Sequence, residues 1–320
     1  MTLRAIVAAC GGELYAGGRR ANIPAPGHSR ADRSVSLLLT QGRVLIHCFG
    51  SATWQEVFQA LRARGLVDAA GAPTCRTASA VSIVESPSAR VRRAAAEALW
   101  TAGRTVSAGT PAAAYGRRRG VARPMATIAA LRSHCAVPLS VYRPTAMTQP
   151  ALLAAVFDAA AALTAVEITY LEPSGRRASR LRIPRKTVGV LPPGSAVRLD
   201  PAATELLVAE GVFTALSAGE RFGLPAWALL STSNLRRWTP PPKVRSVLIA
   251  ADRGRDGEAS AAVLAASLAR LGVRTAIRLP PTGYGDWNDW AQAEVKGRAG
   301  RGAQAAWKVP DGRAGDDPDD

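Results

Sequence analysis

Acidic side chains stand at three places in the last third of the chain, each after a run of residues that predicts a β-strand. Glu210 follows the first run, Asp252 follows an apolar run further along, and Asp286 with Asp289 follows the last. Because parallel strands bring their carboxyl ends to one edge of a sheet, these carboxylates are expected to converge. Each alone is typical of a solvated loop, but together they favour a site for Mg²⁺ or Mn²⁺, which oxygen ligands suit. Such an ion would neutralise charge during phosphoryl transfer.

The segments that must position these carboxylates alternate between strand and helix. Val247 to Ala251 is a continuous apolar run, as expected for a central parallel strand buried on both faces. The alternation predicts a small doubly wound α/β sheet. Its predicted strands span residues 206–209, 226–230, 247–251 and 274–279, and its predicted helices span residues 212–222 and 259–271.

Three motifs in this part of the chain resemble the Toprim domain, the magnesium-binding fold of bacterial and phage primases and topoisomerases. Leu207 to Leu216 resembles its glutamate motif, and Val247 to Glu258 its Asp-x-Asp motif. Gly283 to Asp289 resembles the Asp-x-Asn-Asp segment common in phage and plasmid Toprim primases. The resemblance implies that Glu210 is the catalytic acid/base or a metal ligand, and that Asp252 holds the metal. Further candidate metal ligands are Asp256, Asp286 and Asp289.

Two positions depart from the Toprim pattern. Gly254 stands where the second aspartate of Asp-x-Asp is expected, and Thr214 stands where an acidic residue often follows the glutamate. Losing two carboxylates weakens Mg²⁺ binding unless Asp256 or Glu258 substitutes for one of them. Nucleotidyl transfer is therefore one hypothesis, beside the loss of metal chemistry.

Residues 1–75 resemble the zinc-binding module at the front of bacterial primases, through Pro26-Gly27-His28 and Ile46-His47-Cys48-Phe49-Gly50. Of the four zinc-ligand positions only His28 and Cys48 are kept, since Ala25 and Ser51 occupy the others. A structural zinc site needs four nitrogen or sulfur ligands. A working Zn²⁺ site would have to recruit further ligands, so the pattern favours a degenerate, zinc-ribbon-like module over a working zinc site. The possible recruits are Cys10, His47 and Cys75.

The chain carries 41 Lys and Arg residues against 24 Asp and Glu, a formal charge of +17, which indicates a polyanionic partner such as nucleic acid. Its strongest basic clusters are Arg117 to Arg119 and Arg185-Lys186. The primase resemblance implies that a basic subdomain precedes the Toprim sheet, with Lys186 and Arg185 facing nucleotide phosphates. The alternative for Arg117 to Arg119 is a solubilising surface.

The chain is expected to divide into a degenerate zinc-binding-like module (1–75), a mixed α+β basic primase-like subdomain (91–200), a Toprim domain (204–293) and a disordered tail (296–320). Residues 72–90 are rich in Pro and Ser and are read as a linker. Elsewhere the patterns predict strands over residues 43–48, 166–171 and 176–185, and helices over residues 53–64, 91–102 and 152–163.

These features together predict a primase-like nucleotidyltransferase that makes short primers on a single-stranded DNA template, in phage or mobile-element replication. The alternatives are a non-catalytic DNA-binding Toprim protein and a Toprim nuclease. The sequence contains no Walker phosphate loop, so a replicative helicase is expected as a separate partner. No run is long enough to span a bilayer and the four cysteines are scattered, so we expect a cytoplasmic protein without membrane contact.

Overall fold

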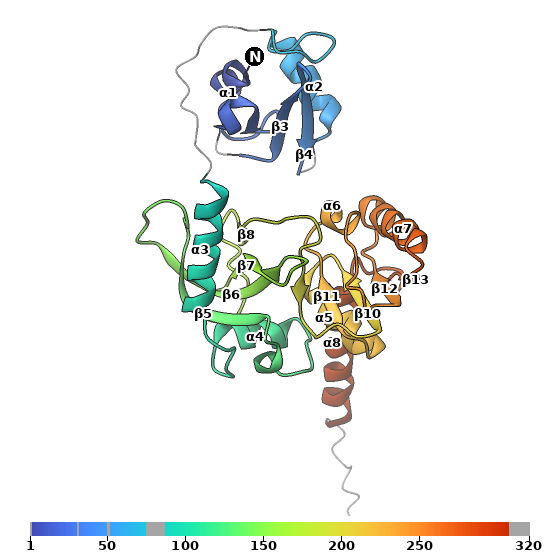
Figure 1. The fold of residues 1–320 in the computed structure, drawn as a ribbon. Helices are drawn as coiled ribbons and strands as arrows, with labels where there is room; N and C mark the ends of the chain where they lie inside the picture. The colour runs from blue at the N-terminus through green and yellow to red at the C-terminus, as the bar shows by residue number, and fades with distance from the viewer. Residues whose placement is uncertain (1, 31, 50–51, 75–86, 307–320) are drawn as a thin grey trace, which may run out of the picture. The chain divides into compact units, whose positions relative to one another are not determined.

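The computed structural model describes residues 2–30, 32–49, 52–74 and 87–306. The chain forms two compact units, residues 1–88 and residues 89–320 (Figure 1). The predicted linker falls mainly on residues 75–86, which lie outside the described residues. In the described ranges, no helix has the length and apolar character needed to cross a membrane.

The first unit is an antiparallel four-stranded sheet with the strand order β1-β2-β3-β4. Alternation in β3 turns Val35, Leu37 and Leu39 into the core. Helix α2 begins where the sequence predicts, because Thr53 and Glu56 form a capping box. The elements are α1 (Arg4–Cys10), β1 (Glu13–Tyr15), a 3-10 turn (Ala16–Gly18), β2 (Arg20–Ile23), β3 (Val35–Thr40), β4 (Arg43–Cys48) and α2 (Trp54–Ala63).

The second unit begins with an antiparallel sheet in the order β5-β6-β7-β8. Helix α3 packs on one face of this sheet, against Val166, Ile168 and Tyr170 (Figure 1). The other face of this sheet packs into the main hydrophobic core of the unit. The elements are α3 (Ala89–Ala102), α4 (Pro111–Arg118), a 3-10 turn (Met125–Thr127), β5 (Leu131–Pro138), β6 (Thr148–Phe157), β7 (Leu163–Tyr170) and β8 (Arg185–Gly189).

Two predictions in this sheet are wrong. Residues 152–163, predicted as a helix, belong to strand β6, the following turn and the start of β7. Both faces of β6 are buried, so its apolar residues show no alternation that would mark a strand. Residues 176–185 were predicted as a strand, but they form turns and coil until β8 begins at Arg185.

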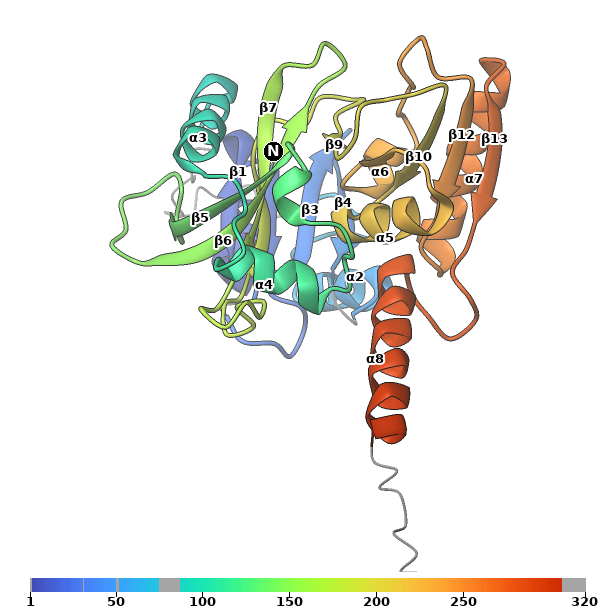
Figure 2. The same ribbon diagram turned by 90° about the horizontal axis from the view of Figure 1, so that it is seen from below.

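The second sheet of this unit has the order β13-β12-β10-β11-β9, and all its strands are parallel except β9. Helix α5 packs on the face that contains Leu207, and helix α7 on the face that contains Val208 (Figure 2). The predicted doubly wound α/β sheet is therefore confirmed. The elements are β9 (Val197–Arg198), β10 (Glu205–Ala209), α5 (Val212–Phe222), β11 (Ala226–Ala228), α6 (Thr232–Leu235), β12 (Ser246–Ala250), α7 (Arg255–Arg270), β13 (Arg274–Arg278) and α8 (Trp287–Ala306).

The end of the chain differs from the prediction. Helix α8 runs to Ala306, so residues 296–306, which were expected to be disordered, are helical. Residues 307–320 of the predicted tail lie outside the described residues. The predicted division at residues 200–204 falls inside the second compact unit.

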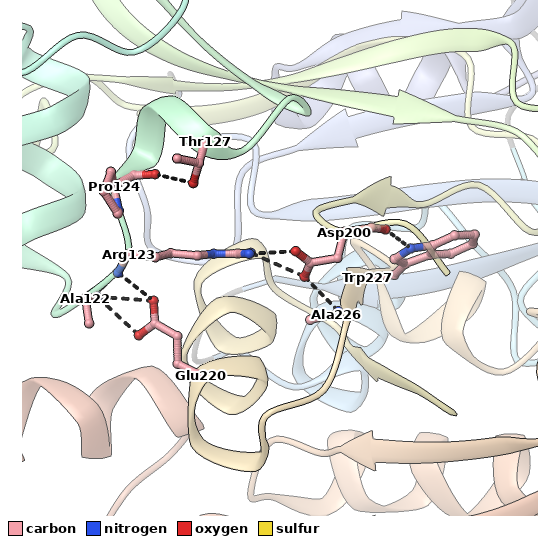
Figure 3. A network of polar contacts seen from close by, with 8 residues as sticks. All are labelled: Ala122, Arg123, Pro124, Thr127, Asp200, Glu220, Ala226 and Trp227. Atoms are coloured by element: carbon pink, nitrogen blue, oxygen red, sulfur yellow. Dashed lines mark hydrogen bonds and ion pairs between the residues drawn. The ribbon is translucent and has the colours of Figure 1, made fainter. Parts of the chain in front are cut away.

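Polar contacts and a shared core tie the two sheets of the second unit together. Arg123 forms a bidentate ion pair with Asp200, at 2.6 and 3.3 Å (Figure 3). The Glu220 carboxylate on α5 accepts hydrogen bonds from the backbone N–H groups of Ala122 and Arg123, at 3.1–3.2 Å. One hydrophobic cluster contains Leu152 of β6 and Leu207 of β10. The two sheets are therefore held in one arrangement, and residues from both can line a common pocket.

Candidate active site

The acidic residues predicted from the strand ends do approach one another. Residues Ala209 of β10 and Ala250 of β12 are paired in register. Glu210 directly follows Ala209, and Asp252 stands two residues after Ala250. Both line one pocket of about 120 Å³, together with Asp286. Convergence at the carboxyl edge is therefore observed for three of the predicted positions.

Backbone contacts hold the loops that carry these carboxylates. The Glu210 carbonyl accepts a hydrogen bond from the Leu230 N–H at 2.7 Å, and the Gly285 carbonyl accepts one from the Arg253 N–H at 2.7 Å. Gly257 lies so close to the preceding loop that a Cβ there would stand 2.6 Å from the Asp252 carbonyl oxygen. A glycine at this position therefore lets α7 begin directly beside the Asp252 backbone.

Asp252 is the most perturbed carboxyl group of the pocket. Burial, followed by the negative charges of Asp286, Glu210 and Asp289, raises its pKa to about 7, and only Arg185 opposes this. Its Oδ1 atom is buried and has no hydrogen-bond partner in the described residues. A buried carboxylate oxygen without a partner is unfavourable unless a cation or a donor meets it.

Glu210 is perturbed in the same direction. Burial and the nearby Asp256 charge raise its pKa, and Arg185 lowers it. Arg185 therefore acts electrostatically on both Glu210 and Asp252, and it lines the same pocket. Arg185 thus lies beside the carboxylates, while its contact with nucleotide phosphates stays a prediction.

Lys186 does not line the pocket in which the sequence placed it. Successive residues of a strand point to opposite faces, so Lys186 lies on the face opposite to Arg185. Its Nζ donates a hydrogen bond to the Leu139 carbonyl at 2.8 Å and lies 5.1 Å from the centre of the Tyr170 ring. Partial burial lowers the pKa of Lys186. We therefore correct its expected position, and Lys186 supports the sheet.

The remaining acidic candidates have local roles in the described structure. Asp256 forms an exposed ion pair with Arg236. The Asp286 Oδ1 accepts the Asp289 N–H at 2.7 Å, at the start of α8. The Asp289 side chain is exposed and does not line the pocket. Of these, only Asp286 belongs to the pocket.

Neither departure from the Toprim pattern is offset by Glu258. Its carboxylate accepts the Gly254 N–H at 3.1 Å and so closes the first turn of α7. Gly254 has φ +120°, a backbone conformation that disfavours a side chain. Thr214 is buried in α5 and lines the pocket, where it offers a hydroxyl in place of a carboxylate.

Three charged residues of the pocket were not singled out as its wall by sequence reasoning. Glu167 lies on β7, Arg119 follows α4, and Arg177 lies in the turn after β7. Glu167 occupies the strand face that carries Ala165 and Leu171 in the core, so a carboxylate at this alternate position was the available signal. Burial raises the pKa of Glu167, and the charge of Arg185 opposes this. Basic groups from residues 90–199 thus face carboxylates from residues 205–297.

The pocket offers the oxygen ligands that Mg²⁺ and Mn²⁺ prefer. Asp252 has the unpartnered buried oxygen, and Glu210 and Asp286 line the same wall. Within the described ranges, no group of three or more acidic, His or Cys side chains is arranged to hold an ion. Mg²⁺ is held by one or two carboxylates with substrate phosphates and waters, so the residue types fit it.

The zinc candidates of the first unit lie in different surroundings. The His28 Nδ1 lies 3.2 Å from an Asp32 carboxylate oxygen, while Cys48 packs on β4 beside the core. The Cys10 Sγ accepts a hydrogen bond from Arg64 at 3.2 Å. The described His and Cys side chains of this unit form no group of three or more that could hold an ion, and Cys75 lies outside the described part of the chain. The described residues of the first unit therefore give no support to Zn²⁺ binding.

Residues 205–297 match the family model described as the Toprim domain. This part of the chain is a Toprim domain. The match confirms the resemblance drawn from the glutamate, aspartate and Asp-Trp-Asn-Asp motifs. Residues 90–199, which supply the basic wall of the pocket, match a model described as a domain of unknown function, DUF7146. No curated protein matches the chain.

Several solved primases are similar to this chain. The Aquifex aeolicus primase, with zinc-binding and RNA polymerase domains, is 14% identical with a TM-score of 0.42, covering 94% of this chain and 82% of that one. The RNA polymerase domain of the Mycobacterium tuberculosis primase DnaG, solved with a DNA oligomer, is 15% identical with a TM-score of 0.41, covering 67% and 81%. The bacteriophage T7 primase fragment is 11% identical with a TM-score of 0.35, covering 60% and 70%.

Proposed function

We propose that this chain is a primase-like nucleotidyltransferase that makes short primers on single-stranded DNA in the replication of a phage or mobile element. The observation that carries the proposal is the pocket in which Glu210, Asp252 and Asp286 of the Toprim domain face Arg185. Carboxylates for a divalent cation beside a guanidinium for phosphate suit phosphoryl transfer. The charge of +17 supports a nucleic-acid template as partner.

In this proposal Asp252 and Asp286 hold Mg²⁺ or Mn²⁺, and Glu210 completes the metal site or acts as the base. Bound metal would neutralise negative charge on the phosphate oxygens. Glu210 accepts the proton of the attacking hydroxyl as that oxygen bonds to the α-phosphorus and pyrophosphate leaves. Its raised pKa suits this, because a carboxylate titrating nearer to neutrality is a better base. Arg185 contacts the phosphate chain and limits charge repulsion among the carboxylates.

A non-catalytic DNA-binding protein is the second candidate, and Gly254 and Thr214 favour it. Both stand where the Toprim pattern carries acidic groups, and Asp256 and Glu258 are engaged with Arg236 and Gly254. Such a protein would keep the basic surface without the transfer reaction. A Toprim nuclease, the third candidate, would nick supercoiled DNA in the presence of Mg²⁺ or Mn²⁺.

The deciding measurement is primer synthesis on single-stranded DNA with labelled ribonucleotides and Mg²⁺ or Mn²⁺. We expect Glu210→Gln and Asp252→Asn each to lower product formation by about 100-fold or more. Glu205→Gln is the matched control, because Glu205 is exposed at the opposite end of the strand that precedes Glu210. Absence of products from the wild type, with salt-sensitive DNA binding unchanged by either substitution, would favour the binding protein.

A replicative helicase is also proposed as a partner. Co-purification and stimulation of primer synthesis by the partner would support this. The absence of both would count against it.

A further inference from the structure

Strand β4 lies at an edge of the sheet in the first unit, because the strand order ends with it. The Val44 N–H points away from β3, since it donates a hydrogen bond to the Gly71 carbonyl at 2.9 Å. In an antiparallel ladder the N–H groups of alternate residues point the same way, so those of Ile46 and Cys48 also point to the open side. Among the described residues, the Gly71 carbonyl is the only backbone partner found on that side. The edge of β4 can therefore accept a further strand.

A groove of about 920 Å³ runs along this edge and the outer face of the sheet. The strand register places Arg20, Leu38 and Leu45 in one row across β2, β3 and β4. Helix α2, which packs beside β4 (Figure 1), adds Trp54 and Phe58 to the wall. Leu45 is 56% exposed and Trp54 is 55% exposed. Large apolar side chains exposed together around one groove are typical of an interaction surface.

The charges of the groove narrow the class of partner. Arg20 and Arg43 line it, and no Asp or Glu of the described chain does so. Asp68 precedes the lining loop, but its Oδ1 accepts hydrogen bonds from the N–H groups of Ala70 and Ala72, at 2.9 and 2.8 Å. The groove therefore complements a ligand that combines acidic groups with apolar ones.

Two features of the groove suit a peptide better than a nucleic acid strand. Single-stranded nucleic acid is held by basic grooves that track its phosphates, whereas the lining here is mostly aliphatic and carries two arginines. The outward N–H groups of Ile46 and Cys48 match the carbonyl groups of an extended peptide backbone. Both features are found on the same side of β4.

We propose that the first unit binds an extended peptide segment of a partner protein, rich in acidic and apolar residues, as a strand added to β4. Main-chain hydrogen bonds to Ile46 and Cys48 hold the peptide, while Leu45 and Trp54 contact its apolar side chains. The two arginines of the groove pair with its acidic residues. This docking role is separate from metal binding by the first unit and from the transfer reaction proposed for the second.

The test uses the full chain and a displayed library of random linear peptides. We expect the enriched peptides to alternate apolar residues and to carry acidic ones. Leu45→Ser should weaken the best peptide by about tenfold or more. Leu271→Ser is the matched control and should change the affinity by less than about twofold, because Leu271 is also 56% exposed but lies in the second unit. No enriched peptide, or equal affinities of the two variants, would overturn the proposal.

Hydrogen exchange of single amides distinguishes an added strand from a peptide that only covers the surface. A saturating amount of the best peptide should slow exchange at Ile46 and Cys48. Exchange at Leu45 and His47 should change little, because their N–H groups already face β3. Unchanged exchange at Ile46 and Cys48 would contradict strand addition.

An oligothymidylate probe tests nucleic acid as the occupant of the groove. We expect Leu45→Ser and Trp54→Ser to leave its affinity within about twofold of the wild type at the same salt concentration, because neither substitution removes a cation. If bases stack in the groove, Trp54→Ser weakens oligothymidylate selectively, and that result would overturn the peptide assignment. Circular dichroism checks that each variant is folded.

Discussion

At the scale of single residues, the negative charge around Asp252 outweighs Arg185, the one cation that lowers its pKa. Arg185 lowers the pKa of Asp252, but burial and three neighbouring carboxylates outweigh it. The native protein therefore binds a proton at Asp252 more tightly than the unfolded chain does. This favours folding below the unfolded pKa near 3.8, and the contribution is lost as the pH rises through the folded value of about 7.

Asp252→Asn should consequently stabilise the metal-free protein at about pH 8, by on the order of 1–3 kcal/mol, and have little effect near pH 4–5. The reason is that Asn cannot take on the unfavourable buried charge. The measurement is chemical unfolding in EDTA at both pH values, with Glu205→Gln as the exposed control. The same stability change at both pH values would show that the effect is not due to ionisation.

The sequence located the acidic side of the pocket and missed most of its basic side. Glu210 and Asp252 could be found because each directly follows an apolar strand. Arg119 lies in a run of three arginines, and nothing in that run distinguishes the one that contacts Phe213. Lys186 and Arg185 are neighbours in sequence but lie on opposite faces of β8, which only the strand's position reveals.

At the scale of elements, alternation predicted strands well only where one face is exposed. Strand β4 matches the prediction over residues 43–48, because its residues alternate between core and surface. Strand β6 is buried on both faces, between α3 and the main core, and its apolar run resembled a helix. Helix α7 begins before the predicted residue 259, since Gly254 and Glu258 close its first turn.

Placing an aspartate at position 254, where the Toprim pattern expects one, should lower the stability of the protein. Gly254→Asp places a side chain in open space, but at φ +120°, so we expect a destabilisation of about 1–3 kcal/mol. Gly109→Asp is the control, because Gly109 is exposed, has open space around it and lacks this backbone conformation. Denaturant midpoints compare the two. A Gly254→Asp protein as stable as wild type would show that the loop can change its conformation.

At the scale of the whole second unit, the pocket depends on how two sheets are held together. Its basic side comes from residues that precede the Toprim domain, and its acidic side comes from the domain itself. The ion pair between Arg123 and Asp200 and the contacts of Glu220 lie at the junction of these two parts (Figure 3). Substitutions that remove these contacts should disturb the arrangement of the pocket residues, although the contacts lie outside the pocket.

Arg123→Met should lower the free energy of unfolding by about 1.5–3 kcal/mol, because it leaves the partly buried Asp200 carboxylate without its cation. The exposed Arg118→Met should change it by less than about 0.5 kcal/mol. Urea unfolding followed by circular dichroism measures both. Equal midpoints for the two variants would show that the ion pair adds nothing to stability.

Strand β9 has a consequence for where this sheet can be divided. It pairs with β11 through Arg198 and Trp227, and it lies before residue 205, where the Toprim match begins. A fragment that starts at residue 205 would keep the pairing of β11 with β10 but leave the other edge of β11 unpaired, and it would expose Trp227, which is buried in the intact unit. Open sheet edges pair with other chains, so such a fragment would self-associate. The boundary of the family and the boundary of independent folding therefore fall at different positions.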